Sequence, residues 1–173
     1  YQIPGLADER IKESLSRIAI AVQQSGYEMP RTKLLINLAP ADTRKTGTAF
    51  DLPIALGILL ATGQIKDGGR LQDNIIAGEL GLDGSIGAVR GALCVADLVG
   101  RGGFKGCILP AANAREAALV AGIAGDGAGH LNEGRGGLSG DGALRPTGGG
   151  FPEIIPGPGR DCREVKGQLR VER

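Results

Sequence analysis

The stretch NLAPADTRKTGTAFDLPIALG, residues 37–57, decides the fold expected for this chain of 173 residues. It begins inside an apolar run, Lys33–Ala39, that predicts a largely buried strand. It ends inside a predicted helix, Leu52–Thr62, with Asp51 as the residue that caps its free amides. That helix is apolar on nearly every side, which predicts a central and buried position. A polar loop joins the strand to the helix.

Both flanks of this stretch carry periodic signals. Asp8–Ser25 predicts an amphipathic helix, because its apolar residues recur at helical spacing. Asn74–Leu82 and Ser85–Val89 predict the two strands of a hairpin. Its turn is Asp83 and Gly84, residue types that supply the positive φ that a type I′ turn needs at both positions. Further along the chain we expect a helix over about 91–99, a strand over 107–109 and a helix over 112–121.

This order of elements gives an α/β or α+β domain, and we favour α+β because the hairpin forces antiparallel pairing. The periodicity stops after Ile123. The residues from 122 to 150 are rich in glycine and cannot bury enough apolar surface to offset their ordering entropy, and 151–159 adds a Pro/Gly run. We therefore predict a folded domain over 1–123 and a Gly/Pro-rich linker over 124–160.

Composition argues against several classes of protein. The net charge is only +1, which gives little reason to expect a strong nucleic-acid surface. The three cysteines form no CxxC pair, so buried thiols in a reducing cytoplasm are expected. No apolar run reaches the ~18 residues that a membrane span needs, and we expect a cytoplasmic protein without a membrane partner. Because the chain starts at Tyr1, we also expect it to be part of a longer one.

No catalytic or cofactor motif is complete in the sequence. The phosphate-binding P-loop needs Gly-x-x-x-x-Gly-Lys-Ser/Thr, and the glycines that should precede Lys45 and Thr46 are missing. Metal-ligand clusters are absent. The single histidine, His130, lies in the glycine-rich segment, which is a poor support for a Ser-His-Asp triad. The chain is therefore expected to hold no cofactor.

Two stretches of the sequence stand out as candidates for a functional site. They are residues 37–57 and residues 78–91, GELGLDGSIGAVRG. Physical reasoning alone favours a scaffold role for both. That role needs only turns at Gly47, Asp83 and Gly84, a cap at Asp51, and solvated loop charges at Arg44 and Lys45.

In their longer forms, NLAPADTRKTGTAFDLPIALGILLATGQI and GELGLDGSIGAVRGAL, these stretches closely resemble the amino-terminal region of the ComM/YifB family of magnesium-chelatase-related AAA+ ATPases. GLADERIKES and ILPAANAREAALV match the same region, so the resemblance covers Ile3 to Ile123. DCREVKGQLRVER resembles the entry into the family's ATPase module, which makes 161–173 the expected start of a truncated module. In the family about two strands precede the position of Tyr1, so part of the sheet is expected to be missing.

The resemblance implies a fold similar to the proteolytic domain of Lon, which is of the ribosomal-S5-domain-2 type. Lon-like proteases activate a serine with a lysine. Their pattern puts Ala49 at the serine position and Leu93 at the lysine position, and neither side chain carries a nucleophilic or basic atom. The family pattern thus implies no catalytic activity in this chain.

For the parent protein the resemblance implies a hexameric ATPase that uses ATP and Mg and drives DNA branch migration in natural transformation and recombination. This chain would be its non-catalytic assembly or substrate-binding domain. The alternatives are an ATP-dependent Ser-Lys protease domain and a subunit of a magnesium chelatase. For Arg44 and Lys45 the hypothesis is a weak contact with DNA or a neighbouring subunit, and the alternative is a solvated loop.

Overall fold

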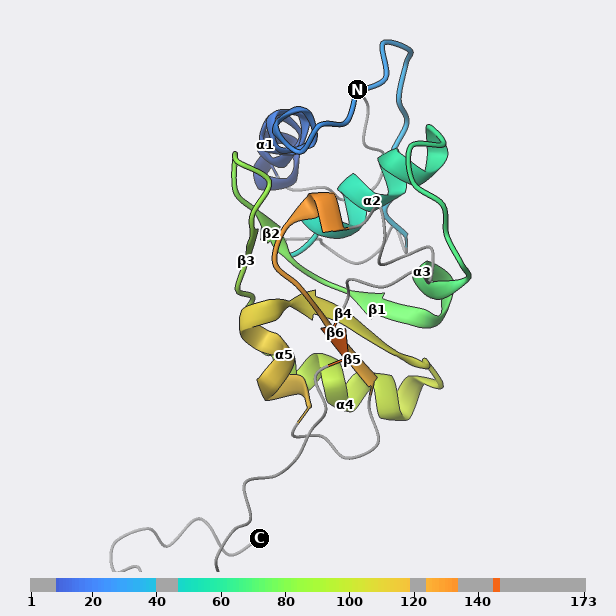
Figure 1. Cartoon of the computed structure of the whole chain (residues 1–173), viewed down its shortest axis with the longest axis vertical. Coiled ribbons are helices and arrows are strands. Elements are labelled where there is room, and N and C mark those ends of the chain that lie inside the picture. Colours follow the sequence, from blue (N-terminus) through green and yellow to red (C-terminus); the bar gives the residue numbers. More distant parts are fainter. Residues whose placement is uncertain (1–8, 40–46, 119–123, 134–144, 147–173) are drawn as a thin grey trace, which may run out of the picture.

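A computed structural model of the chain describes residues 9–39, 47–118, 124–133 and 145–146 (Figure 1). The strands are β1 (Asn74–Ile76), β2 (Glu79–Leu80), β3 (Ile86–Gly87), β4 (Gly106–Pro110), β5 (Ala124–Ala128) and β6 (Arg145–Pro146). The main sheet has the order β1-β4-β5-β6, in which β1, β4 and β5 are parallel and β6 is antiparallel to β5. The strands β2 and β3 form a separate antiparallel pair.

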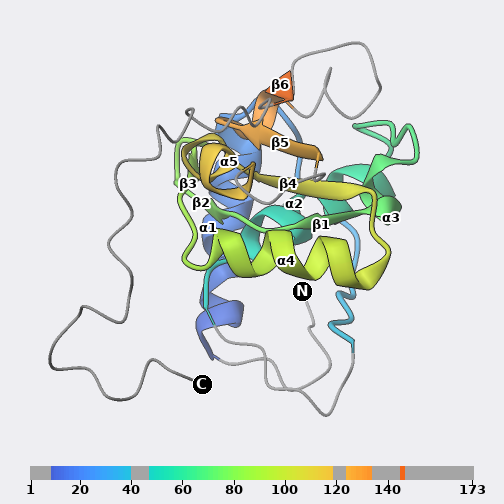
Figure 2. The same ribbon diagram turned by 90° about the horizontal axis from the view of Figure 1, so that it is seen from below.

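The helices lie on both faces of the main sheet. They are α1 (Glu9–Gln24), α2 (Asp51–Ala61), α3 (Arg70–Asp73), α4 (Ala92–Gly102) and α5 (Ala111–Ala117), followed by the 3-10 turn η1 (Leu131–Glu133). Figure 1 shows α1 and α2 on one side and α4 and α5 on the other, and Figure 2 shows α4 alongside β1 and β4. Alternate residues of β4 serve the two faces: Cys107 and Leu109 pack with α4 and α5, whereas Ile108 belongs to the core around α2.

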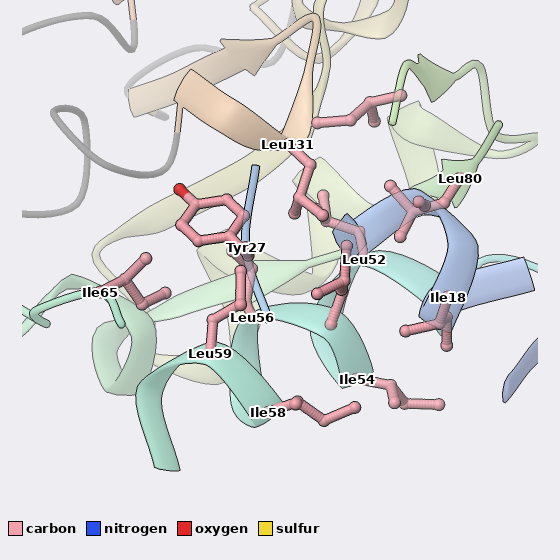
Figure 3. Packing of buried hydrophobic residues seen from close by; sticks show 14 of the residues in the cluster. Ile18, Tyr27, Leu52, Ile54, Leu56, Ile58, Leu59, Ile65, Leu80 and Leu131 are labelled. Atoms are coloured by element: carbon pink, nitrogen blue, oxygen red, sulfur yellow. The ribbon is translucent and has the colours of Figure 1, made fainter. Parts of the chain in front are cut away.

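The larger core surrounds α2 (Figure 3). Seven of its eleven residues are buried. Ile18 of α1, Leu80 of β2 and Leu131 of η1 pack around it. Burying one Leu or Ile side chain contributes about 1.5–3 kcal/mol. The burial of α2 therefore holds three segments together that are far apart in the sequence.

The predicted helices are confirmed in type and place. α1, α2, α4 and α5 lie where helical periodicity and apolar composition put them, and β4 contains the predicted strand 107–109. Asp8, the first residue of the predicted helix Asp8–Ser25, lies outside the described residues. The mixed helix and sheet structure is consistent with the α+β class, although most pairing in the main sheet is parallel. The S5-type fold stays a prediction.

The predicted strand Asn74–Leu82 is wrong as a single element. The chain leaves the main sheet after β1, and only Glu79–Leu80 pairs within the hairpin. Between the two strands Gly78 is in backbone contact with the start of α2. Its N–H donates to Ala49 O at 3.0 Å, and its carbonyl accepts from Leu52 N at 3.0 Å. This contact takes the hydrogen bonds with which a continuous strand would have paired.

The segment Lys33–Ala39 belongs to no strand of the described sheets, apart from a single bridge at Leu35. Its burial alternates, because Leu34, Ile36 and Leu38 lie partly buried against the core while Leu35 is 64% exposed. The prediction of a largely buried strand is wrong, since only one side of the segment meets the core around α2.

The glycine-rich segment begins as part of the fold, unlike the linker predicted from Ala124 onward. β5 pairs with β4 in parallel over five residues. At Gly127 a Cβ would lie 3.0 Å from Ala114 Cβ and 3.2 Å from Ala111 Cα, so glycine allows α5 to pack closely on the strand. Gly127, one of the glycines that suggested a linker, serves close packing here. The predicted linker at 134–144 and 147–160 and the predicted ATPase start at 161–173 lie outside the described residues.

Gly78→Ala is expected to destabilise the fold by about 1–3 kcal/mol through overpacking. A Cβ at this position would lie 2.9 Å from Leu52 Cδ2 and 3.0 Å from Ile86 Cγ2. Gly100→Ala is the matched control, because Gly100 is exposed in α4 and an added Cβ meets no other atom within 4 Å. Alanine there is expected to stabilise the helix by about 0.5–1 kcal/mol. The free energy of unfolding of both variants is measured with urea. If the two substitutions change it equally, the close packing at Gly78 is contradicted.

Candidate functional site

The candidate site is the end of the polar loop that precedes α2. We call Gly47–Phe50 the loop exit. Arg44 and Lys45, the cations predicted to contact DNA or a subunit, lie outside the described residues. Gly47 has a φ of 94°, which agrees with its predicted place in a turn. All four residues of the loop exit are half-buried.

Asp51 does not cap α2, contrary to the sequence prediction. Phe50 precedes the helix, and no side chain caps its amides. Asp51 is the first helical residue and is fully buried. Its Oδ2 accepts from Arg17 Nε at 2.8 Å and from Leu80 N at 3.3 Å. The carboxylate therefore joins α1, α2 and β2 rather than closing the end of its own helix.

Arg17 is the cation that balances this buried charge. Its side chain is 27% exposed, against 0% for Asp51, and its Nη2 donates to Ser14 Oγ at 2.9 Å. The hydrogen bond to Asp51 raises the pKa of Arg17; burial opposes the rise, and the negative charges of Asp51, Glu79 and Glu13 add to it. Arg17 thus stays charged across the physiological pH range.

Two further bonds tie the loop exit to the strand side of the site. Thr48 Oγ1 donates to Glu79 Oε2 at 2.7 Å, and Ala49 O accepts from Gly78 N at 3.0 Å. The structure thus places the Glu79 carboxylate next to the Thr48 hydroxyl. The bond is best understood as an anchor.

Sequence reasoning missed Arg17 and Glu79 as members of the site. From periodicity Arg17 counts as a charged residue off the apolar stripe of α1, and Glu79 as part of a hairpin strand. One signal was available: Asp51 stands alone among apolar residues, and a buried carboxylate requires a cation or several donors. That requirement is only partly met within the described part of the chain, where Asp51 Oδ1 has no hydrogen-bond partner.

The hairpin turn encloses three residues rather than the predicted two. Gly84 has a φ of 88°, as expected. The bonds from Gly81 N to Ser85 O, at 2.8 Å, and from Gly84 N to Gly81 O, at 3.0 Å, close the longer loop. The Asp83 carboxylate accepts from Ser85 Oγ at 2.6 Å and from Ser85 N at 3.0 Å, and these bonds lower the pKa of Asp83. Asp83 stabilises the turn through its side chain.

His130 packs against this turn instead of lying in a linker. Its Nε2 bonds to Asp83 O at 2.9 Å, and its Nδ1 accepts from Asn132 N at 3.2 Å. Next to it, Leu131 N donates to Gly84 O at 2.8 Å. One ring nitrogen bonds the hairpin and the other bonds η1, so the histidine has a structural part in this arrangement.

An apolar groove of about 280 Å³ lies beside the loop exit. It is lined by Leu34–Leu38 on one wall, and by Phe50 with Pro53, Ile54, Gly57, Ile58 and Ala61 of α2 on the other. Asn37 is the single polar residue type in its lining. The groove is suited to apolar contact and offers no charged group for chemistry.

The thiols and possible metal ligands give no second site. Cys107 is buried, and burial, followed by the charge of Asp126, raises the pKa of its thiol. Cys94 is exposed, which corrects the expectation of a buried thiol, and Cys162 lies outside the described residues. The described ranges contain no group of three His, Cys, Asp or Glu side chains that could hold a metal ion. Nor does any helix among them have the length and apolar character needed to cross a membrane.

Arg17→Met is expected to cost about 3–5 kcal/mol of stability, because it leaves the Asp51 carboxylate buried without a counter-charge. Asp51→Asn is expected to cost less, since the partly exposed Arg17 can turn to water and the amide oxygen can still accept from Leu80 N. The double variant should therefore be more stable than Arg17→Met alone. The free energy of unfolding is measured with urea for the original chain, the two single variants and the double variant, which completes a double-mutant cycle. A double variant less stable than Arg17→Met would argue against a buried charge pair.

Comparison with known proteins places this architecture in a family. Residues 1–113 match the family described as subunit ChlI of Mg-chelatase. The chain is 40% identical to the YifB protein of Salmonella typhimurium over 116 residues, 67% of this chain and 22% of that protein. It is 36% identical to the competence protein ComM of Haemophilus influenzae over 120 residues, 69% of this chain and 23% of that protein. The chain thus spans less than a quarter of the length of these relatives. It belongs to the Mg-chelatase ChlI-subunit family, alongside the magnesium-chelatase-related proteins ComM and YifB.

Proposed function

We propose that this chain is a non-catalytic assembly or substrate-binding domain of a longer magnesium-chelatase-like AAA+ ATPase. The parent is proposed to be a cytoplasmic, hexameric motor that drives DNA branch migration in natural transformation and recombination. Family membership supports the magnesium-chelatase-like part, and likeness to a competence protein supports the role in transformation. ATP and Mg are assigned to the parent's ATPase module, because this sequence contains no phosphate-binding loop.

The observation that carries the non-catalytic role is the chemistry of Ala49. Its carbonyl anchors the loop exit to Gly78, so the backbone at the expected nucleophile position is held in place. The side chain there is a methyl group. Leu93, at the expected lysine position, is 43% exposed in the first turn of α4 and has no basic atom. A Ser-Lys mechanism needs a nucleophilic oxygen within hydrogen-bond reach of an amine. A held loop without the serine oxygen and the lysine amine of that mechanism supports a binding role.

A magnesium-chelatase subunit is the second candidate, and the family description favours it. The two candidates predict different activators of the parent protein. A branch-migration motor should hydrolyse ATP faster when branched DNA is added, whereas a chelatase subunit should respond to a porphyrin substrate and its partner subunits. ATPase rates of the longer protein with each addition decide between them.

The chain is expected to show no peptidase activity, even beside an active motor. A fluorophosphonate probe that reacts with activated serine and threonine hydroxyls should leave it unlabelled, while an active serine hydrolase in the same tube is labelled. Labelling that disappears in Thr48→Val would revive the protease alternative, because Thr48 is the hydroxyl bonded to Glu79.

The double change Arg44→Ala/Lys45→Ala tests the proposed contact in the longer protein. If each cation faces a DNA phosphate, the slope of log affinity against log salt should fall by about 0.7–0.9 per contact, and affinity should fall with it. If they contact a neighbouring subunit, hexamer formation should weaken instead. Arg101→Ala/Lys105→Ala removes the same charge from two side chains that are each 78% exposed, and is the control. No change in affinity, slope or assembly would leave the loop as a simple connection.

A further inference from the structure

The loop exit is held mainly by polar bonds, in contrast to the apolar core beside it. Four bonds among the described residues retain it: Thr48 Oγ1 to Glu79 Oε2 at 2.7 Å, Gly78 N to Ala49 O at 3.0 Å, Asp51 N to Thr48 O at 3.1 Å, and Ile54 N to Phe50 O at 3.0 Å. Of its four residues, Phe50 alone packs against the larger core. Little apolar surface therefore opposes its release.

The ion pair between Arg17 and Asp51 lies next to these bonds. Asp51 N donates to Thr48 O of the loop exit, and Asp51 Oδ2 also accepts from Leu80 N, the neighbour of Glu79. Arg17 fixes that carboxylate from α1 at 2.8 Å. The ion pair therefore joins α1 to the point where α2 and β2 meet, next to the bond between Thr48 and Glu79.

We propose that the Arg17–Asp51 pair is a latch for the loop exit. With the pair made, Gly47–Phe50 lies against β2. With the pair broken, this segment moves away about Gly47 while the two hydrophobic cores stay folded. Gly47 suits a hinge, because its φ of 94° is in the region that glycine enters freely and none of the described residues places an atom within 4 Å of its Cβ position.

The closed latch carries a cost beside the gain from its ion pair. Asp51 is fully buried, yet its Oδ1 has no donor among the described residues. A buried polar atom without a partner offsets part of what the ion pair contributes. Arg17 is 27% exposed, so its guanidinium has water as an alternative partner. Both facts favour an opening that is local rather than global.

The latch bears on the proposed function because the loop exit follows directly after Arg44 and Lys45 in the sequence. That link rests on the proposed contact of these two cations with DNA or a subunit. The opening itself does not rest on it, since it concerns only Gly47–Phe50, Arg17, Asp51 and β2. The two ideas can therefore fail separately.

Amide hydrogen exchange on the 173-residue chain tests the latch. In Arg17→Met/Asp51→Asn, exchange at Gly78 is expected to rise at least about tenfold, because its acceptor, Ala49 O, moves away. Exchange at Ile108, in the middle of the main sheet, should stay within about twofold of its original rate. Arg101→Met/Asp97→Asn removes an exposed ion pair of α4, with side chains 78% and 55% exposed, and should change neither rate.

Equal acceleration at Gly78 and Ile108 would overturn the proposal, because the pair would then stabilise the whole fold without a local role. Unchanged exchange at both would overturn it too. Should the double variant fail to fold, Thr48→Val provides a second test. It keeps the ion pair and removes one anchor of the loop exit, and it is expected to accelerate Gly78 selectively by a smaller factor. DNA binding by the longer protein is a separate readout that reports only on Arg44 and Lys45.

Discussion

The burial of α2 is the constraint on which the rest of the structure depends. The helix is apolar on almost every side, so it is stable only when other elements enclose it, and α1, the hairpin and η1 all contribute to that enclosure. Its single charged residue, Asp51, is also buried. An unpaired carboxylate there would cost several kcal/mol, and this requirement orients Arg17 and β2 toward the helix. Apolar burial sets the architecture, and one charge positions the loop exit.

The sequence predicted helices well and strands poorly, for a physical reason. A helix such as α1 repeats its apolar positions over several turns, and the pattern is local. The strands β2 and β3 contain two residues each, too few to show a period of two. The break at Gly78 comes from its contact with Ala49 and Leu52. The residues next to Gly78 in the sequence do not predict that contact. β5 is made of Ala, Gly and Asp, and it becomes a strand through pairing with β4.

At the candidate site, too, local features were predictable from the sequence, whereas contacts between distant segments were not. The turns at Gly47 and Gly84 were predictable, since positive φ is a local preference of glycine. Asp51 was recognised as special but was given a local role as a cap, whereas its partners Arg17 and Leu80 come from other elements. Resemblance to a family identified the stretch that matters. The resemblance could not reveal the hydrogen bonds and the ion pair that this stretch makes, because they depend on where segments distant in the sequence meet.

The closure of the hairpin by η1 also sets an order of events during folding. A hairpin with two residues in each strand does not persist alone in water. The bond between His130 and the carbonyl of Asp83 spans 47 residues of sequence. On the ribosome, the turn therefore stays unfinished until Leu131 has emerged, and contacts of this separation form slowly. A pause of translation within the glycine-rich segment would leave the edges of β2 and β3 open to pairing with other chains.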